Sequence, residues 1–339
     1  MRVALVLPGL DYGGAERMVE ELALAVAQHG HAKVIATTRG GPVADRLIDA
    51  GVPVEVLGLA SPFDARVPLR LRRVLRDFRP GVVHSHLAVA DIATAVAGID
   101  RPCPHWITMH NAGIELGPGK RSLWRWALRR SDARFAVAAH IAQRWGPAEL
   151  VHPSFVSPAA SLDSEHRARR KASLGLGTQP LILSLGRRTP IKGVDVMAAA
   201  SEQLPSTIRW LHYGPGAPPD PPGRIEWRPP RPDVATVLAG ADLFVQASRS
   251  EGFPQATLEA MWSEVPVVVT PVGGTRELVQ TDGLYVPTDD PDALAAGILR
   301  VLSGAVGRER ARQARDRLEA QRLTREGMLE AYLERYGRI

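Results

Sequence analysis

The feature that most constrains the fold of this 339-residue chain is an alternation of short apolar runs with amphipathic stretches. The apolar runs are nearly continuous and several are rich in β-branched residues, as expected of strands that are buried on both faces. A turn follows each run, and then a stretch with the helical period. Repeated strand–helix alternation predicts a parallel, doubly wound sheet, and therefore the α/β class.

The alternation occurs in two blocks. The first block contains predicted strands at residues 3–7, 33–38, 54–59, 82–86, 106–110 and 134–138, and predicted helices at 15–28, 69–78 and 122–130. It ends between residues 150 and 164, where Pro153, Pro158 and several small residues indicate a linker. We therefore predict a first Rossmann-like domain over residues 1–155.

The second block repeats the pattern and predicts a second Rossmann-like domain over residues 165–322. Its strands are expected at residues 181–185, 208–212, 243–247, 266–270 and 284–287, with a helix at 194–203. The stretch 213–231 is rich in proline and glycine and is predicted to be a loop. We expect the last helix, within residues 324–339, to cross back and pack on the first domain.

Composition excludes several classes of protein. The 45% apolar and 23% charged fractions are ordinary for a globular chain, and the one cysteine, Cys103, can form neither an internal disulfide nor a cysteine-based zinc site. The apolar run at residues 3–7 is too short for a signal peptide, and no run approaches the roughly 18 residues of a membrane-spanning helix. We expect a cytoplasmic protein.

The net charge of +6 favours acidic partners such as nucleotides or anionic lipids. The arginines are scattered without interleaved aromatic residues, which argues against an RNA-binding platform. We expect no nucleic acid partner.

Three motifs carry the chemistry, and the first is a glycine pair. Gly13 and Gly14 follow the first predicted strand after a loop and open a helix. Paired glycines let backbone amides approach an anion, and a helix N-terminus adds partial positive charge. The spacing is not that of the dinucleotide fingerprint, so a simple tight turn is the alternative.

The second motif places two cations in a loop. Residues 186–193 read Gly-Arg-Arg-Thr-Pro-Ile-Lys-Gly and leave the first strand of the second block. Arg187 offers a planar fork and Lys192 a point charge, a combination that suits a diphosphate. The alternative is that both are ordinary surface cations.

The third motif is a pair of glutamates eight residues apart. Glu251 precedes a helix that Pro254 can start, and Glu259 lies inside that helix. Carboxylates accept hydrogen bonds from neighbouring hydroxyl groups, so one could hold a sugar and the other a ribose. Alternatively, Glu251 merely caps the helix and Glu259 is solvated.

Together these motifs resemble glycosyltransferase family 4, the retaining GT-B glycosyltransferases. The resemblance adds His84-Ser85-His86, Thr108-Met109-His110, residues 266–270 and residues 273–278, and it covers nearly the whole chain. It implies two Rossmann-like domains that face a central cleft. It also implies transfer of a hexose-type sugar from a nucleoside-diphosphate sugar, with UDP favoured, to a glycan, lipid-linked or small-molecule acceptor bound by the first domain.

The resemblance also implies residue roles. Arg187 and Lys192 would bind the diphosphate, Glu251 the transferred sugar, and Glu259 the ribose. Gly252, Phe253 and Pro254 would complete the donor site, with Gly13 and Gly14 near the diphosphate. His110 would reach toward the sugar, unless it is a core histidine that ends a strand, as we expect of His84 and His86.

No cofactor or metal is expected, because the protein's own cations can neutralise the leaving group, and because Asp289-Asp290 is expected to begin a helix before Pro291 and not to hold a metal ion. A nucleotide-sugar epimerase of the same fold, or a non-catalytic nucleotide-sugar-binding protein, stays as an alternative. Residues 120–130 are basic and contain Trp124 and Trp126, so they could contact an anionic membrane. The alternative there is a helix whose Trp124 and Leu128 pack on the sheet.

Overall fold

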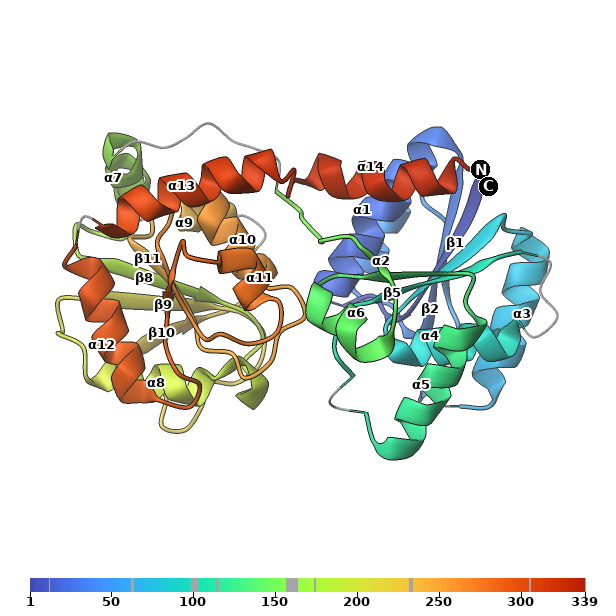
Figure 1. Ribbon diagram of the computed structural model, residues 1–339, viewed down its shortest axis with the longest axis horizontal. Helices are drawn as coiled ribbons and strands as arrows, with labels where there is room; N and C mark the ends of the chain where they lie inside the picture. The colour runs from blue at the N-terminus through green and yellow to red at the C-terminus, as the bar shows by residue number, and fades with distance from the viewer. Residues whose placement is uncertain are drawn as a thin grey trace. The chain divides into compact units, whose positions relative to one another are not determined.

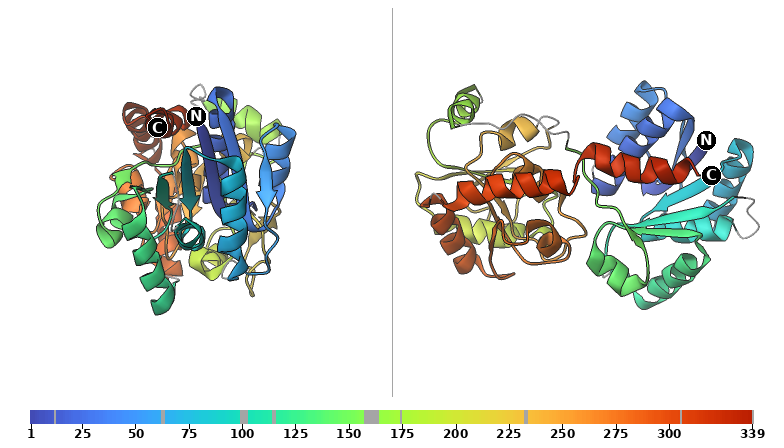
Figure 2. Two further views of the ribbon diagram at one scale, coloured as in Figure 1. Left: turned by 90° about the vertical axis from the view of Figure 1, so that its right-hand side faces the viewer. Right: turned by 45° about the horizontal axis from the view of Figure 1, so that its top comes forward.

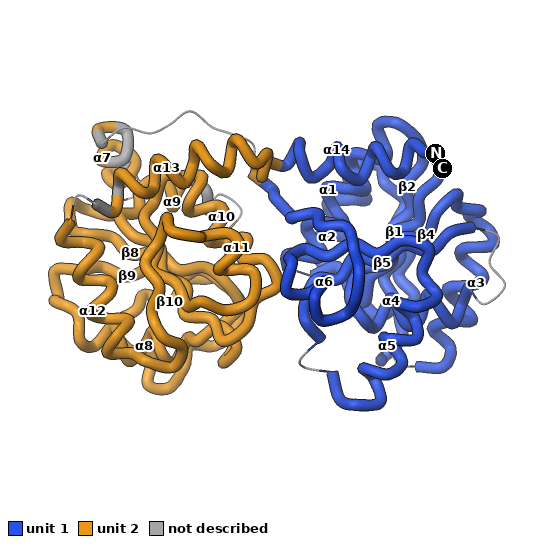
Figure 3. The backbone as a smooth tube through the Cα atoms, in the orientation of Figure 1, with its two compact units in different colours: residues 1–155, 325–339 blue, residues 156–324 orange. Residues whose placement is uncertain are grey.

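The computed structural model describes residues 1–11, 13–61, 64–98, 103–113, 116–156, 164–173, 175–231, 234–304 and 306–338. The chain forms two compact units, shown in Figure 3. Unit 1 comprises Met1–Phe155 with Arg325–Ile339, and unit 2 comprises Val156–Thr324. Part of the predicted linker, residues 157–163, lies outside the described residues.

In the described part of unit 1, a seven-stranded sheet has the order β3-β2-β1-β4-β5-β6-β7, and its neighbouring strands are parallel. The predicted α/β architecture is confirmed. The strands are β1 (Arg2–Gly9), β2 (His31–Arg39), β3 (Val54–Val56), β4 (Val82–His86), β5 (His105–Met109), β6 (Ala133–Ala136) and β7 (Glu149–Leu150).

Helices cover both faces of this sheet (Figure 1). Leu5 and Leu7 of β1 pack with α1 (Gly14–His29), α2 (Pro42–Asp49) and α14 (Arg325–Tyr336). Ala4 and Val6, which point to the other face, pack with α3 (Arg66–Phe78) and α4 (Ala88–Ala97). Successive side chains of a strand point to opposite faces, so one apolar run supplies both cores. Helices α5 (Pro118–Arg130) and α6 (Ala139–Trp145) complete the unit.

The C-terminal helix α14 belongs to unit 1, and Figure 2 shows it as the red helix near the two termini. Its apolar stripe is buried, from Met328 and Leu329 to Tyr332 and Tyr336. Arg325 at its start donates a 2.6 Å hydrogen bond to Glu21 of α1. Packing of this stripe explains why a helix of such modest apolar content forms, since tertiary burial supplies most helical stability.

In the described part of unit 2, a six-stranded sheet has the order β10-β9-β8-β11-β12-β13, again with parallel neighbours. The strands are β8 (Leu181–Leu185), β9 (Arg209–Tyr213), β10 (Ile225–Arg228), β11 (Leu243–Gln246), β12 (Val267–Val269) and β13 (Leu284–Tyr285). Helices α8 (Val194–Glu202) and α12 (Pro291–Leu302) pack on one face around Val245 and Val268. The remaining helices are α7 (Ser164–Ser173), α9 (Val234–Leu238), α10 (Gln255–Trp262), α11 (Thr275–Val279) and α13 (Val306–Ala320).

One secondary-structure prediction is wrong. The stretch 213–231, predicted to be a loop, contains β10, which pairs in parallel with β9 from Ile225↔Trp210 to Arg228↔Tyr213. Only Ile225 of this four-residue strand is fully buried, and proline and glycine surround it. An edge strand needs few apolar residues, so its sequence pattern is weak, and the neighbouring prolines and glycines led to the prediction of a loop.

Candidate functional site

In each sheet, the strand order reverses between two neighbours. The chain moves outward from β1 to β3 and returns to the other side of β1 as β4, and it does the same from β8 to β10 and back to β11. Open α/β sheets bind ligands beyond the carboxyl ends of such strands. The glycine pair follows β1, the cationic loop follows β8 and the first glutamate follows β11, so all three motifs lie at these positions.

The cationic loop of unit 2 is held against the end of β11. Gly193 has φ 64°, and a Cβ atom there would lie 2.0 Å from the carbonyl oxygen of Ala247. Glycine is therefore required for both its backbone conformation and the close approach. The loop is also tied by a 2.8 Å hydrogen bond from the Arg249 amide to the carbonyl oxygen of Ile191. These contacts place Lys192 beside the segment that carries Glu251.

Lys192 and Glu251 form an ion pair, with 2.6 Å between Nζ and Oε1. The buried Ser248 donates a second 2.6 Å hydrogen bond to the same Oε1 atom. The Glu251 side chain is only 8% exposed, so its carboxylate is both desolvated and held in one orientation. Sequence reasoning selected Lys192 and Glu251 separately but did not predict that they touch, and it missed Ser248.

Arg187 has a different environment from Lys192. Its side chain is exposed and forms no hydrogen bond or ion pair with any described residue. The Oε2 atom of Glu251 likewise has no partner in the described part of the chain. The loop thus carries an exposed, unpaired guanidinium as well as a lysine–glutamate pair that keeps one carboxylate oxygen available.

The rest of the predicted donor-binding set follows Glu251 directly. Gly252 is half-buried, Phe253 is 7% exposed, and Pro254 is the residue before the first turn of α10. Glu259 lies half-buried within that helix. Gly273 packs directly against this segment. Its φ is 52°, and a Cβ atom added at this position would lie 1.9 Å from the carbonyl oxygen of Glu251, so the position requires glycine.

Arg249 joins the two loops of this site. Its guanidinium donates to the carbonyl oxygen of Pro190, to both carboxylate oxygens of Asp195 at 2.8 and 2.7 Å, and to Asp289 at 2.6 Å. The hydrogen bond from Arg249 lowers the pKa of Asp195. One side chain therefore braces residues 186–193 against the loop after β11.

We predict that Arg249→Ala raises the KM for the nucleotide sugar that the sequence motifs lead us to expect by roughly tenfold, because a loosened loop misplaces Lys192. The free energy of unfolding should change by no more than about 1 kcal/mol, since these ion pairs are partly exposed. Arg249→Lys keeps the charge but not the fork, and it should recover only part of the loss. Steady-state kinetics and urea unfolding measure both quantities, and an unchanged KM in Arg249→Ala contradicts the bracing role.

In unit 1, Gly13 and Gly14 are exposed at the N-terminus of the 16-residue helix α1. His110 follows β5 and is half-buried. Burial lowers its pKa to about 3, so it is neutral at physiological pH. His84 and His86 are fully buried.

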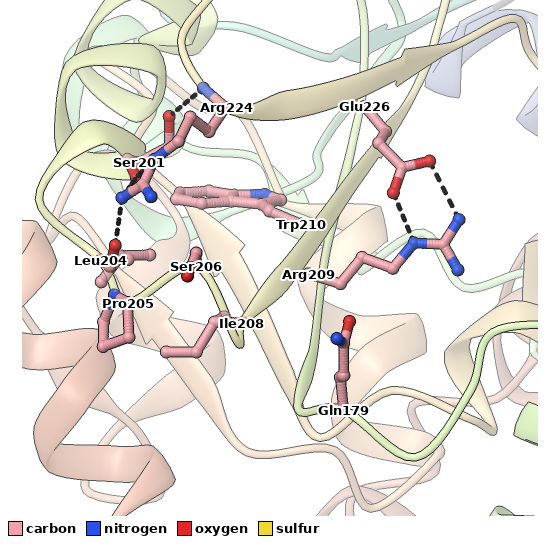
Figure 4. Close-up of a pocket in the computed structure, with 10 residues that line it drawn as sticks. All are labelled: Gln179, Ser201, Leu204, Pro205, Ser206, Ile208, Arg209, Trp210, Arg224 and Glu226. Carbon is pink, nitrogen blue, oxygen red and sulfur yellow. Dashed lines mark hydrogen bonds and ion pairs between the residues drawn. The ribbon is translucent and has the colours of Figure 1, made fainter.

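A pocket of about 300 Å³ lies at the opposite, amino edge of the unit 2 sheet (Figure 4). Arg209 at the start of β9 is paired through two hydrogen bonds with Glu226, and Arg224 donates to the carbonyl oxygens of Ser201, Glu202 and Leu204. Because both guanidinium groups are already satisfied, this pocket has little capacity for an anion. The described residues also contain no cluster of three or more histidine, cysteine, aspartate or glutamate side chains arranged to hold a metal ion.

Comparison with known proteins identifies the family. A model of "Glycosyltransferase Family 4" matches residues 12–152, and a model of "Glycosyl transferases group 1" matches residues 179–304. The chain is 30% identical to a D-inositol 3-phosphate glycosyltransferase of Xylanimonas cellulosilytica, in an alignment that covers 90% of this chain and 86% of that protein. The chain belongs to glycosyltransferase family 4.

A second relative and a solved structure support this assignment. This glycosyltransferase is 28% identical to a GDP-mannose-dependent alpha-mannosyltransferase of Mycolicibacterium smegmatis, over 89% of both chains. Its fold is similar to that of Anabaena HepE in complex with UDP and glucose, with a TM-score of 0.86, 17% identity and full coverage of both chains. The predicted family, the GT-B fold class and the enzymatic activity are confirmed. The roles of individual site residues stay predictions.

Proposed function

We propose that this glycosyltransferase moves a hexose-type sugar from a UDP-sugar to a glycan, lipid-linked or small-molecule acceptor, with retention of configuration and without a metal ion. The observation that carries the proposal is the Lys192–Glu251–Ser248 cluster, together with the exposed Arg187 of the same loop. It offers two cations for a diphosphate and a fixed carboxylate for sugar hydroxyls.

The reaction breaks the bond between the anomeric carbon and a phosphate oxygen, which leaves negative charge on the diphosphate. Arg187 and Lys192 supply positive charge to that leaving group, as preorganised cations do in phosphoryl and glycosyl chemistry. The acceptor oxygen then bonds to the anomeric carbon on the face that the diphosphate leaves, and its proton passes to a phosphate oxygen.

Glu251 has a binding role in this proposal and is not a covalent nucleophile. Its Oε1 atom already accepts from Lys192 and Ser248, while Oε2 is left to accept from a sugar hydroxyl. Glu259 is assigned to the ribose, and the backbone of Gly252, Phe253 and Pro254 to the sugar. Gly13, Gly14 and His110 of unit 1 are proposed to contact the donor as well.

The donor is tested first by thermal unfolding with UDP-glucose, GDP-mannose, UDP and GDP, each with and without EDTA. A ligand at about 100 times its dissociation constant stabilises a protein by roughly 2.7 kcal/mol, so the preferred nucleotide gives the largest rise in melting temperature. We expect UDP compounds to stabilise the enzyme in EDTA. Stabilisation by GDP compounds alone, or only with a divalent cation, contradicts the assignment.

The reaction is then tested by incubating the stabilising donor with candidate acceptors and resolving the products by mass spectrometry and NMR. A glycosylated acceptor whose anomeric configuration matches that of the donor supports the proposal. An inverted product contradicts the retaining mechanism, and an altered free sugar without transfer would indicate an epimerase.

We further propose that the acceptor is approached at an anionic membrane surface through α5. Trp124 and Leu128 of this helix are buried in unit 1, so neither is available to lipid. Its outer face is basic, with Lys120, Arg125 and Arg129 exposed and Leu123 half exposed. No described helix is long and apolar enough to cross a bilayer. The contact that we propose for α5 is peripheral and electrostatic, because its exposed face is basic while Trp124 and Leu128 are buried.

Co-sedimentation with vesicles tests this contact. Each basic residue near an anionic surface contributes about 1 kcal/mol, so Arg125→Glu with Arg129→Glu should reduce binding to phosphatidylserine vesicles by well over tenfold. Arg72→Glu with Arg73→Glu, exposed on α3, is a charge-matched control that should bind normally. Absence of wild-type binding to anionic vesicles refutes the contact.

A further inference from the structure

Two histidines meet at the carboxyl edge of the unit 1 sheet. His86 is the last residue of β4, and His110 follows the neighbouring strand β5, in which Thr108 pairs with His86. The Nδ1 atom of His86 lies 2.9 Å from the Nε2 atom of His110. Since side chains alternate along a strand, Thr108 and His110 project to the same face of the sheet as His86.

The two rings differ in exposure. His86 is fully buried, whereas His110 is half-buried. The Nε2 atom of His86 is buried and forms no hydrogen bond with a described residue. In contrast, the Nδ1 atom of His110 is not fully buried, and it makes no hydrogen bond with the described chain. His110 therefore has one ring nitrogen occupied by His86 and the other available.

Both rings are neutral. Burial lowers the pKa of His86 well below 6.5 and that of His110 to about 3. A neutral imidazole has one protonated and one unprotonated nitrogen. In the contact between the two rings, one of the facing nitrogen atoms therefore carries the hydrogen and the other accepts it. Either His86 donates it from Nδ1, or His110 donates it from Nε2.

The unpaired Nε2 atom of His86 decides between these arrangements. If His110 donates, His86 must carry its own proton on Nε2, which leaves a buried N–H group without an acceptor. If His86 donates, its Nε2 is an unpaired acceptor, and among buried backbone groups under-satisfied acceptors are somewhat less rare than orphaned N–H donors. The second arrangement puts the proton of His110 on Nδ1.

We propose that His86 is a positioning residue that orients His110 and holds it in the Nδ1-protonated form, so that His110 donates a hydrogen bond to a hydroxyl group of the donor sugar. This inference rests on the proposed function for the identity of the hydroxyl-bearing ligand. The tautomer itself does not depend on that function. His110 is then a fixed donor and not a general acid.

The rest of the cluster supports the pair. His84 is fixed by the hydroxyl groups of Tyr336 at 2.5 Å and Thr108 at 2.8 Å, and its ring centroid lies 4.3 Å from that of His86. Tyr332 in turn lies 2.9 Å from Thr108. The ring of His86 is thus confined by a buried network that includes two side chains of α14.

The tautomer is tested by two-bond ¹H–¹⁵N correlation spectra of the full chain labelled with ¹⁵N-histidine, at neutral pH and without ligand. The signals of His110 are assigned by their loss in His110→Gln. We expect a protonated Nδ1 and an unprotonated Nε2. A protonated Nε2 on His110 overturns the proposal whatever the enzyme's activity.

The positioning role is tested by kinetics. His86→Asn keeps an amide that can donate near the position of Nδ1, whereas His86→Leu fills the space without a donor. We expect the kcat/KM of His86→Leu to fall by about 10- to 100-fold and that of His86→Asn to stay within a few-fold of wild type. Equal activity of the two folded variants overturns the role.

A double-mutant cycle separates positioning from general destabilisation. If His86 acts through His110, then His86→Leu should cost little further activity in a His110→Ala background. Additive losses overturn the inference. If His110→Ala alone retains full transfer, the placement of His110 in the donor site fails, while the spectra still report the tautomer independently.

Discussion

Replacing Lys192 with alanine is expected to reduce sugar transfer by a factor on the order of 10³, with little effect on the fold. Loss of one preorganised charged donor at a developing anion typically costs about 10² to 10³ in kcat. Here the change also leaves the Glu251 carboxylate, which is 8% exposed, without its cation. The catalytic loss should therefore include a misplaced sugar contact. Transfer rates at saturating donor, with circular dichroism of the purified variant, measure the effect.

Glu251→Ala should cause a loss of similar size, because it removes the carboxylate and releases Lys192 from its 2.6 Å contact. The two side chains act as one unit, so the double variant should lose much less than the product of the single losses. Ser303→Ala, an exposed position after the end of α12, is a control outside the site. Near-normal turnover in folded Lys192→Ala or Glu251→Ala refutes the site assignment.

The second large effect concerns Asp91, a fully buried residue of α4. Its Oδ1 accepts a 2.7 Å hydrogen bond from Ser85, and its Oδ2 accepts a 2.8 Å hydrogen bond from the Nε1 of Trp124. Burial raises the pKa of Asp91 from 3.8 to about 7, although these two hydrogen bonds oppose the shift. Between about pH 4 and about pH 7, the folded protein therefore keeps the Asp91 carboxyl protonated while the unfolded chain releases this proton.

The sign of the pH dependence follows from this raised pKa. The protonated carboxyl contributes its full stability below about pH 3.8 and loses it as the pH rises to about 7. At about 1.4 kcal/mol per pH unit, the change is on the order of 4 kcal/mol at most. Buried His84, His86 and His110, whose pKa values are lowered by burial, have the opposite slope below pH 6.5.

Asp91→Asn isolates the carboxyl from these histidines. Asparagine has nearly the same shape and can still accept from Trp124, but it does not titrate. We expect the free energy of unfolding of wild type, minus that of Asp91→Asn, to fall steadily between about pH 4 and about pH 7 and to level off above. Urea unfolding across this range measures the difference. A flat difference curve means that Asp91 is ionised in the folded state throughout.

The fold could be predicted from the sequence to a large extent, because helical and strand periods are local properties. The strands β4 and β8 were predicted with their observed bounds, and most others within one or two residues. The predictions failed where local apolar character is weak. β10 is a short edge strand among prolines. The helix α7 was not predicted because its sequence is polar and has no apolar stripe.

The candidate site could be predicted as a set of residues but not as a set of contacts. Gly186–Gly193 and Glu251 were recognisable because glycine, cations and a carboxylate follow strands in a doubly wound pattern. That Lys192 and Glu251 form an ion pair across 59 positions of sequence depends on β8 and β11 being neighbours and on Gly193 packing against Ala247.

The sequence alone therefore determined the α/β class, the two repeated blocks, the family and the set of residues that we propose for the donor site. Only the tertiary structure decided which of those groups touch: Lys192 with Glu251, His86 with His110, and Trp124 with the buried Asp91 instead of a lipid surface. The physical reason is that periodicity is determined by neighbours along the chain. Hydrogen-bonded pairs and raised or lowered pKa values depend on which strands lie side by side and on how much water the packing excludes.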